Sequence, residues 1–404
     1  MRLPSKVEVI VAGHICLDVI PDLGATGLDA LLIPGKLVNV GEAVTATGGT
    51  VANTGLALHR LGVPTRLMGK VGRDLFGRAI LDLLEQYGSG LTESMIIREG
   101  EQSSYSIVIS PRGSDRIFFH CPGTNDTFGA DDVDYDQLVG ARLFHFGYPP
   151  LMKRMFADDG REMELMLSRV KARGLIVSLD LSRPDPDSEA GKVDWRSILT
   201  RVLPQVDLFL PSMEEILFML DRERFDASTA DGEGRTLIEQ VDGALLSSLS
   251  EQLLQMGAAV VAIKLGDQGL YVRTTNEKQR IEAICGGISS EVGNYWMHWL
   301  DRELLVPCFE VKVAGTTGAG DCTIAGFLSG LLHGLTLEET MIAAVGTGAC
   351  NVEAIDATSG IPSWTEVLQR ISDGWERNSV ILALPAWKWD SSASVWTGPH
   401  DRVI

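Results

Sequence analysis

Residues 313–335 read VAGTTGAGDCTIAGFLSGLLHGL. We expect an apolar strand over 308–313 before the small-residue turn, and an apolar helix directly after it. Ile324, Leu328 and Leu331 repeat at helical spacing, so the turn lies at a helix N-terminus. Glycines at such a position let backbone N–H groups approach a ligand closely, and the helix dipole favours negative charge there.

Asp321 ends this turn, where it would repel a bound phosphate. Its presence makes sense if it takes a proton from a hydroxyl group while Gly318, Ala319 and Gly320 hold the developing phosphoryl charge with their N–H groups. A tight turn without any ligand is the alternative. The dinucleotide fingerprint fits poorly because Thr323 replaces its third glycine, and no GxxxxGK[ST] sequence occurs in the chain.

A second glycine-containing segment, 48–77, reads GGTVANTGLALHRLGVPTRLMGKVGRDLFG. Gly48 and Gly49 would let a small polar ligand touch the backbone, and Asn53 offers both a donor and an acceptor to hydroxyl groups. A hydrogen bond at the helix start is the alternative role for Asn53. In this order along the chain, the two segments resemble the N-terminal and C-terminal signatures of the PfkB/ribokinase family of sugar kinases.

Strand-like and helical segments alternate along the chain, which is typical of a mostly parallel sheet between two helical layers. We expect strands at 7–11, 67–71, 143–147, 175–179, 208–210, 260–264 and 309–313, and helices at 51–61, 75–87, 161–172, 214–220, 245–256, after the turn, and at 337–354. The polar segments 222–242 and 275–300 are interpreted as insertions or mobile loops.

The resemblance covers residues 7–372 and implies a ribokinase-like three-layer α/β/α domain at 1–372. It also implies a small β-sheet lid over the sugar, from about 16–47 and 98–120. Residues 373–404 lie outside the resemblance and contain four of the eight tryptophans. Disordered segments are poor in aromatic residues, so we expect this extension to pack on the body or on a partner subunit.

Three further residues are assigned to the acceptor sugar by the resemblance. Asp18 follows the first strand, where open α/β sheets bind ligands, although a turn-capping aspartate is the alternative. Asn125 lies in a Gly-Thr-Asn-Asp turn, which needs no ligand to exist. Arg116 would close over the acceptor from the lid, unless it is an ordinary surface charge.

The metal site is assigned to Glu215, which matches the glutamate of a family element that organises Mg²⁺ through water. Ser212 replaces the asparagine of that element, a change that water-mediated ligation of Mg²⁺ tolerates. Gly315 stands where the family has an acidic residue linked to monovalent-cation sites, so the resemblance does not carry potassium dependence over to this chain.

The remaining assignments concern ATP. Asp180 and Arg183 resemble a family element at a strand end. The Lys264-Leu-Gly-Asp-Gln-Gly269 loop resembles the nucleotide loop of the family, and its glycines would let the backbone pass close to ribose and phosphates. A plain hairpin turn is the alternative for this loop. The residues assigned to the nucleotide on this basis are Asp180, Arg183, Lys264, Gly266, Gly269, Thr317 and Asn351.

Composition limits the possible partners. The formal net charge of −19 argues against broad contact with nucleic acid or anionic membranes, which requires a basic surface. The six cysteines show no metal-ligand spacing, and no apolar run approaches membrane-spanning length. We therefore expect a cytoplasmic protein with reduced thiols, whose partners are a sugar and ATP, with a homodimer through the lid as one possible assembly.

The combined interpretation is an ATP-dependent sugar kinase that acts on a hydroxyl group, an exocyclic CH₂OH in the simplest case, with Asp321 as the base. A nucleoside kinase of the same fold is one alternative, but no aromatic residue that could hold a base occurs before Phe76. A non-catalytic member that binds a sugar or nucleotide is the other, supported by the replacements at Gly315 and Ser212 and opposed by the intact Asp321.

Overall fold

The fold is built on one large twisted sheet, seen in a computed structural model that describes residues 7–24, 26–31, 33–111, 116–229, 237–286 and 295–402. Within these residues ten strands follow the order β15-β16-β14-β13-β12-β11-β10-β9-β1-β4. Their bounds are β1 (Val9–Gly13), β4 (Thr65–Met68), β9 (Leu143–Gly147), β10 (Ile176–Leu179), β11 (Leu208–Phe209), β12 (Val260–Lys264), β13 (Leu270–Thr274), β14 (Glu303–Val306), β15 (Lys388–Asp390) and β16 (Val395–Thr397).

In this sheet, neighbouring strands pair in parallel from β12 through β11, β10, β9 and β1 to β4. The other pairs, β12 with β13, β13 with β14, β14 with β16 and β16 with β15, are antiparallel. The parallel strands are apolar and buried on both faces, as expected where helices cover both sides of a sheet. Successive residues of β1 show this: Val9 and Val11 belong to one hydrophobic core, and Ile10 and Ala12 to the other.

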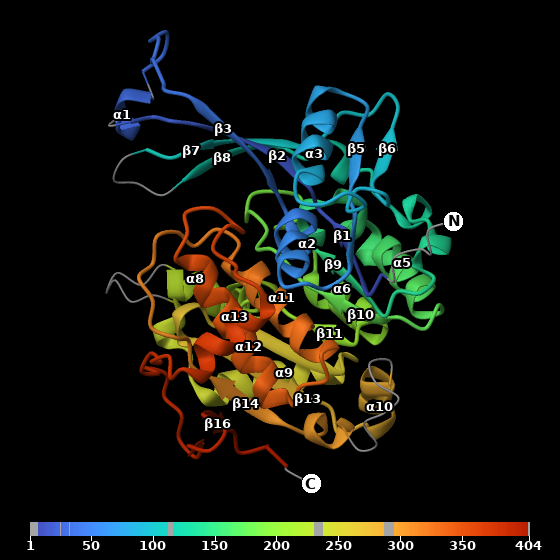
Figure 1. Cartoon of the computed structure of the whole chain (residues 1–404), viewed down its shortest axis with the longest axis vertical. Helices are drawn as coiled ribbons and strands as arrows, with labels where there is room; N and C mark the ends of the chain where they lie inside the picture. Colours follow the sequence, from blue (N-terminus) through green and yellow to red (C-terminus); the bar gives the residue numbers. More distant parts are fainter. Residues whose placement is uncertain are drawn as a thin grey trace.

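Helices form a layer over each core, which makes three layers (Figure 1). The first core contains residues of α2 (Thr50–Arg60), α3 (Leu75–Glu85), α10 (Lys278–Gly286), α11 (Ala319–Leu332), α12 (Leu337–Val352) and α13 (Trp364–Ser372). The second contains residues of α4 (Lys153–Phe156), α5 (Arg161–Lys171), α6 (Trp195–Val202), α7 (Met213–Leu220), α8 (Arg222–Thr229) and α9 (Gly243–Gln255).

A second sheet of four strands extends away from the body at one end (Figure 1). Its strands are β2 (Cys16–Pro21), β3 (Ala43–Gly48), β7 (Tyr105–Ile109) and β8 (Ile117–Cys121), in the order β3-β2-β7-β8, with α1 (Leu28–Leu31) between β2 and β3. To within one residue, these strands lie inside the two segments expected to supply the lid, 16–47 and 98–120. A separate two-stranded sheet joins β5 (Lys70–Gly72) to β6 (Ile96–Arg98).

The C-terminal segment extends the main sheet rather than lying across it. β16 pairs with β14, and β15 forms the edge of the sheet next to it. Trp387 inserts into the second core with 7% of its surface exposed, and Trp375 stacks on Phe309. The carboxylate of Asp401 accepts hydrogen bonds from the Arg302 side chain at 2.8 Å and from a backbone N–H at 2.9 Å, which fixes the end of the segment.

Three expectations about the elements are wrong. Residues 309–313 form no strand; Phe309 makes only an isolated bridge to Arg377, and the strand of this region, β14, lies earlier in the sequence. The stretch 67–71 is divided at Gly69 between β4 and β5, which belong to different sheets. For the polar segments 222–242 and 275–300 the loop alternative is wrong, since they contain α8 and α10, and the insertion alternative stays a prediction. Residues 230–236 and 287–294 lie outside the described residues.

Candidate active site

The GAGD turn joins an irregular segment to α11. Gly318 is the residue before the helix and has a φ of 74°, a left-handed conformation that glycine adopts without strain. A side chain at Gly318 would also come within 2.9 Å of Ala357, on the segment that packs against the turn. The turn therefore needs glycine at this position for two reasons, and it places Asp321 in the first turn of α11 with 3% of its surface exposed.

Three side chains donate hydrogen bonds to the Asp321 carboxylate. Asn53 Nδ2 lies 3.1 Å and the Tyr148 hydroxyl 2.7 Å from Oδ2, and Thr54 Oγ1 lies 3.0 Å from Oδ1. Asn53 and Thr54 come from α2, whereas Tyr148 directly follows β9, so elements distant in sequence fix the orientation of the carboxylate.

Tyr148 adopts a left-handed backbone conformation with a φ of 65°, which is uncommon for a bulky residue and occurs where the surrounding structure enforces it. Burial, followed by the charge of Asp321, holds the pKa of the Tyr148 hydroxyl well above its ordinary value. The hydroxyl therefore remains a proton donor to Asp321.

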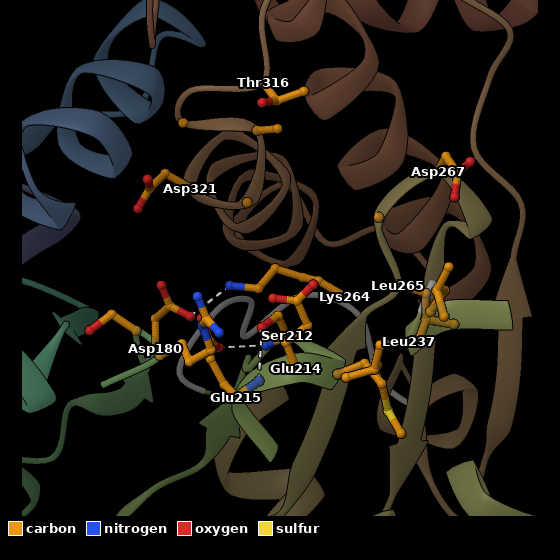
Figure 2. Close-up of a pocket in the computed structure, with 18 of the residues that line it drawn as sticks. Asp180, Ser212, Glu214, Glu215, Leu237, Lys264, Leu265, Asp267, Thr316 and Asp321 are labelled. Atoms are coloured by element: carbon orange, nitrogen blue, oxygen red, sulfur yellow. Dashed lines mark hydrogen bonds and ion pairs between the residues drawn. The ribbon is translucent and has the colours of Figure 1, made fainter. Parts of the chain in front are cut away.

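A cavity of about 510 Å³ opens between the GAGD turn and the carboxyl ends of β10, β11 and β12 (Figure 2). Ligands bind at this edge in open α/β sheets. Asp321 and Thr316 face Asp180, Lys264 and Glu215 across it. Of the residues expected at the site, those that line the cavity are Asp180, Arg183, Glu215, Lys264, Gly266, Gly318, Ala319, Gly320 and Asp321.

Lys264 and Asp180 form a buried ion pair on the cavity wall, with Nζ 2.7 Å from Oδ1. Burial raises the pKa of Asp180, and the ammonium group of Lys264 acts against that rise. For Lys264, burial lowers the pKa, but Asp180 and Glu215 outweigh it and the pKa is raised. A side chain added at Gly320 would lie 3.5 Å from Lys264 Nζ, so a cation is held beneath the turn.

Glu215 belongs to a capping box at the start of α7. Its Oε2 accepts a hydrogen bond from the Ser212 N–H at 2.6 Å, and Ser212 Oγ accepts one from the Glu215 N–H at 3.3 Å. Ser212 therefore has a clear local role in starting the helix. The same arrangement holds Glu215 at the cavity, where the carboxylates of Glu214 and Asp267 also lie.

Gly269 and Asn351, both expected at the nucleotide, do not line this cavity. A side chain at Gly269 would come within 1.9 Å of the Val306 carbonyl, so the glycine allows close packing of strands. Asn351 is fully buried in α12, and its Nδ2 donates to the Ala357 carbonyl at 2.7 Å. It thereby fixes the segment that supports Gly318.

The expected acceptor residues gather where the lid meets the body. Asp18 lies in β2, and a side chain at Gly48 in β3 would come within 2.4 Å of its Oδ2. Gly49 has a φ of 90° and packs against His14 in the same way. Burial raises the pKa of Asp18, against the effect of its hydrogen bond from Cys16.

Two other acceptor candidates have partners within the protein. Arg116, which is exposed on the lid, donates a hydrogen bond to the Thr317 hydroxyl and so links the lid to the GAGD turn. Asn125 is fully buried; its Oδ1 accepts from the Ile15 N–H at 3.2 Å and its Nδ2 donates to the Ile15 carbonyl at 2.9 Å. Both the oxygen and the nitrogen of the Asn125 side-chain amide thus bind the backbone of Ile15, so Asn125 is not part of the proposed acceptor site.

Sequence reasoning missed several residues of the site, above all Tyr148 and Thr54. Tyr148 follows the expected strand 143–147 directly and precedes two prolines, a position at the ligand-binding edge that could have been recognised. Thr54 gave no signal beyond its place next to Asn53. The cavity is also lined by Leu237 and Ile238, which belong to a segment interpreted as an insertion.

The chain is similar to several known proteins. A family model described as "pfkB family carbohydrate kinase" matches residues 7–364. The chain is 27% identical over 307 residues to an uncharacterized sugar kinase of Archaeoglobus fulgidus, covering 76% of this chain and 98% of that protein. It is 23% identical to fructokinase-1 of Zea mays over 90% of this chain and 98% of that one.

Among solved structures, a ribokinase of Arabidopsis thaliana complexed with ribose and ATP superposes with a TM-score of 0.65 at 18% identity. The superposition covers 90% of this chain and 98% of that one, which shows that the two share the ribokinase fold. No helix in the described part of the chain is both long and apolar enough to span a membrane.

Proposed function

Since the chain belongs to the pfkB family of carbohydrate kinases, which are phosphotransferases with an alcohol group as acceptor, we propose that it moves the γ-phosphoryl group of ATP to a sugar hydroxyl, with Asp321 as the base. An exocyclic CH₂OH is the simplest acceptor group, since it can reach the carboxylate from a sugar ring held by the lid.

The observation that carries this proposal is the environment of Asp321. All three of its hydrogen-bond partners donate, as an unprotonated carboxylate requires, and they hold it at the edge of an open cavity. A residue that only capped a helix would need neither Tyr148 nor the cavity. A carboxylate oriented in this way suits the removal of a proton from a hydroxyl group in the transition state.

The phosphoryl charge would be held by the turn and by Lys264. N–H groups in the first turn of a helix have no acceptor within that helix, and Gly318, Ala319 and Gly320 at the start of α11 line the cavity. The Ala319 N–H donates to the Thr316 carbonyl at 3.3 Å, and a phosphoryl oxygen would take the place of that acceptor. Lys264 adds a positive charge beneath Gly320. Stabilisation of the transferring group by fixed donors and cations is the main source of catalysis in phosphoryl transfer.

The chemistry of the cavity also fits Mg²⁺, which prefers oxygen ligands and keeps several bound waters. Glu215 is the residue that would orient such waters, with Asp180 and Asp267 as further carboxylates on the same wall. When bound with ATP, the ion would neutralise phosphate charge. Monovalent-cation dependence is not part of the proposal.

The acceptor would lie between the lid and the turn. Asp18, Gly48 and Gly49 form one side of this space, and the contact of Arg116 with Thr317 brings the lid to the catalytic turn. Asn53 lies at its base, next to Asp321. The lid would therefore exclude water from the reacting groups, which prevents transfer of the phosphoryl group to water.

Assembly and location remain predictions. All six cysteines are unpaired in the structure, which supports a reducing, cytoplasmic location. The lid exposes Val44, Phe118 and Phe119, and this supports a homodimer formed through the lid.

The proposal is tested by measuring ATP consumption, in the presence of Mg²⁺, over a panel of pentoses, hexoses, keto-deoxy acids and nucleosides. We expect turnover with a sugar or sugar acid, and ³¹P-coupled NMR of the product would identify the phosphorylated hydroxyl. Preferred turnover of nucleosides would replace the proposal with the nucleoside kinase alternative. Binding of a sugar without turnover of any acceptor would instead support the non-catalytic alternative.

A further inference from the structure

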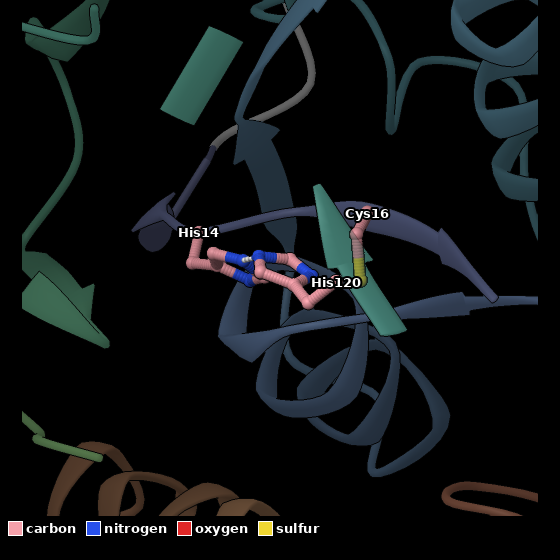
Figure 3. Close-up of side chains that lie close together, drawn as sticks. All are labelled: His14, Cys16 and His120. Atoms are coloured by element: carbon pink, nitrogen blue, oxygen red, sulfur yellow. Dashed lines mark hydrogen bonds between the residues drawn. The ribbon is translucent and has the colours of Figure 1, made fainter. Parts of the chain in front are cut away.

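Three side chains with metal-ligating atoms meet where the lid joins the body (Figure 3). His14 lies in the connection between β1 and β2, Cys16 begins β2, and His120 lies in β8. Their ligand atoms are all within 4.8 Å of one another. We propose that His14, Cys16 and His120 bind a transition-metal ion of the zinc type, separate from the Mg²⁺ that accompanies ATP.

The spacing of the two imidazoles suits one ion. His14 Nε2 and His120 Nε2 lie 3.4 Å apart. Two nitrogens bound to a tetrahedral zinc ion at its usual bond length are about 3.3 Å apart. The Cys16 sulfur lies within 4.8 Å of both nitrogens and would be the third ligand. Nitrogen and sulfur ligands favour zinc-type ions over Mg²⁺, which prefers oxygen.

Ser106 in β7 orients two of the three ligands. Its Oγ lies 3.0 Å from His120 Nδ1 and 3.8 Å from Cys16 Sγ. If Nδ1–H of His120 donates to Ser106, the Ser106 hydroxyl can donate to the sulfur. This arrangement leaves the lone pair of His120 Nε2 directed at the cluster. Outer hydrogen bonds of this kind fix the tautomer of metal-binding histidines.

The orientation of the His14 ring leaves one nitrogen for the cluster. His14 is 2% exposed, and its Nδ1 is a buried atom without a hydrogen-bond partner among the described residues. Nδ1 lies against Gly49, where a side chain would come within 2.5 Å. Among the described residues, the only hydrogen-bond contact of the His14 ring is the one between its Nε2 and His120. Nδ1 faces Gly49 and not the cluster, so Nε2 is the atom of His14 that is available to an ion shared with His120.

Binding would release one proton. The Cys16 thiol now donates to Asp18 Oδ1 at 3.3 Å, and it must lose this hydrogen to bind the ion as thiolate. The proton passes to water, and the proton on His14 Nε2 moves to Nδ1 if that tautomer is present. No oxidation or reduction occurs in this step.

The consequence for turnover rests on the proposed function. An ion held by His14 of the body and His120 of the lid would tie the two parts together, next to Asp18 and Gly48. It would also remove the thiol hydrogen bond that Asp18 now accepts. We therefore expect the ion to inhibit competitively with respect to the acceptor sugar and not with respect to ATP.

The metal site is tested on the full-length, metal-free protein in excess Mg²⁺, by calorimetric titration with Zn²⁺ and by absorption spectroscopy with Co²⁺ as the probe. We expect one equivalent to bind, with the intense visible bands of four-coordinate Co²⁺ and a thiolate-to-cobalt charge-transfer band. Cys16→Ser should abolish the charge-transfer band, and His120→Gln, a change at an exposed position, should weaken Zn²⁺ binding at least tenfold.

The matched control is Cys121→Ser, because Cys121 is next to His120 but its thiol is not part of the cluster. It should leave binding and spectrum unchanged. The metal site would be overturned if the Cys16→Ser and Cys121→Ser variants bound Zn²⁺ with equal affinity. A Co²⁺ spectrum of the unmodified protein without the thiolate-to-cobalt band would overturn it as well. These measurements do not require turnover, so they remain decisive if no sugar is phosphorylated. If Zn²⁺ binds but does not inhibit competitively with respect to the acceptor sugar, the inhibitory role is overturned and the metal site stands.

Discussion

The hydroxyl group of Tyr148 donates a hydrogen bond of 2.7 Å to Oδ2 of Asp321, although 173 positions separate the two residues in the sequence. Tyr148 reaches the carboxylate because its backbone turns left-handed directly after β9, at the edge of the sheet where the cavity opens. Asn53 binds the same oxygen from α2. The orientation of the proposed base thus depends on two structural elements besides its own helix.

Replacing Tyr148 with phenylalanine should therefore impair catalysis more than stability. A hydrogen bond to a charged group contributes about 1.5–3 kcal/mol, so we expect kcat to fall roughly tenfold to a hundredfold in Tyr148→Phe. Steady-state kinetics with the identified acceptor, together with the melting temperature, would measure this. Tyr135→Phe is the control, since its hydroxyl donates to the Ala130 carbonyl away from the cavity. Equal kcat values for the two variants would show that Tyr148 does not position Asp321.

The base itself is tested by Asp321→Asn. The amide cannot take a proton from the acceptor, so kcat should fall by about 10²–10⁴, the usual contribution of general-base catalysis. ATP binding, measured by calorimetry, should persist because the turn and Lys264 are unchanged. Asp187→Asn, at an exposed position, serves as the matched control for loss of one negative charge. A folded Asp321→Asn enzyme with wild-type turnover would contradict the assignment.

The main features of the fold could be predicted because they depend on local patterns. The strands β9 and β12 match their expected ranges, since each is a short, mostly apolar run that ends at a glycine or just before a turn. The stretch 309–313 reads Phe-Glu-Val-Lys-Val, an alternation of apolar and charged residues that is typical of a strand, but its neighbour is the C-terminal segment and not a sheet strand. An apolar run indicates burial, and long-range pairing then decides whether it becomes a strand.

The site was predicted less completely, for a similar reason. Asp321 and the glycines before it are recognisable because their chemistry lies in one contiguous turn. The contact of Tyr148 with Asp321, and the pairing of Asp180 with Lys264, join residues that only the folded sheet brings together. Asn125 shows the opposite case, in which a residue suited to bind a ligand makes its hydrogen bonds with the backbone.

The acceptor site can be tested at Gly48. In Gly48→Ala the new methyl group would lie 2.4 Å from Asp18 Oδ2 and would displace the carboxylate. We expect KM for the acceptor to rise roughly tenfold or more, the cost of losing about 1–3 kcal/mol of hydrogen bonding, while KM for ATP stays the same.

Gly27→Ala is the control for this change, because it lies in the same lid segment and an added methyl group meets nothing within 4 Å. If Gly48→Ala raised KM for ATP and left KM for the acceptor unchanged, Asp18 would belong to the nucleotide site instead.

The C-terminal segment should contribute to stability through Trp387. Trp387 is 7% exposed and packs in the second core, whereas Trp389, two residues later, is 43% exposed. Trp387→Ala should lower the free energy of unfolding by about 3–5 kcal/mol, the usual cost of removing a buried tryptophan. Trp389→Ala should lower it much less. Urea denaturation would compare the two, and equal losses would mean that the segment does not anchor through its buried ring.

The acid stability of the protein should depend on His145. Its imidazole lies between Thr50 Oγ1 at 3.3 Å and Ser178 Oγ at 3.0 Å, fully buried in the sheet. Burial, helped by the charge of Lys264, lowers the pKa of His145 from 6.5 to about 3. In the unfolded chain the group regains its ordinary pKa. Below pH 6.5 the unfolded state therefore binds a proton that the native state does not accept until about pH 3.

It follows that the stability due to neutral His145 is fully present above pH 6.5 and is lost as the pH falls towards 3. The loss amounts to about 1.4 kcal/mol per pH unit for one proton. In His145→Gln, which keeps polar atoms for Thr50 and Ser178, the slope of unfolding free energy against pH between these limits should decrease by about that amount. The surface variant His298→Gln should leave the slope unchanged. The slope is compared and not the absolute stability, so a general weakening of the fold cannot imitate the result. An unchanged slope in His145→Gln would show that the native imidazole binds its proton normally.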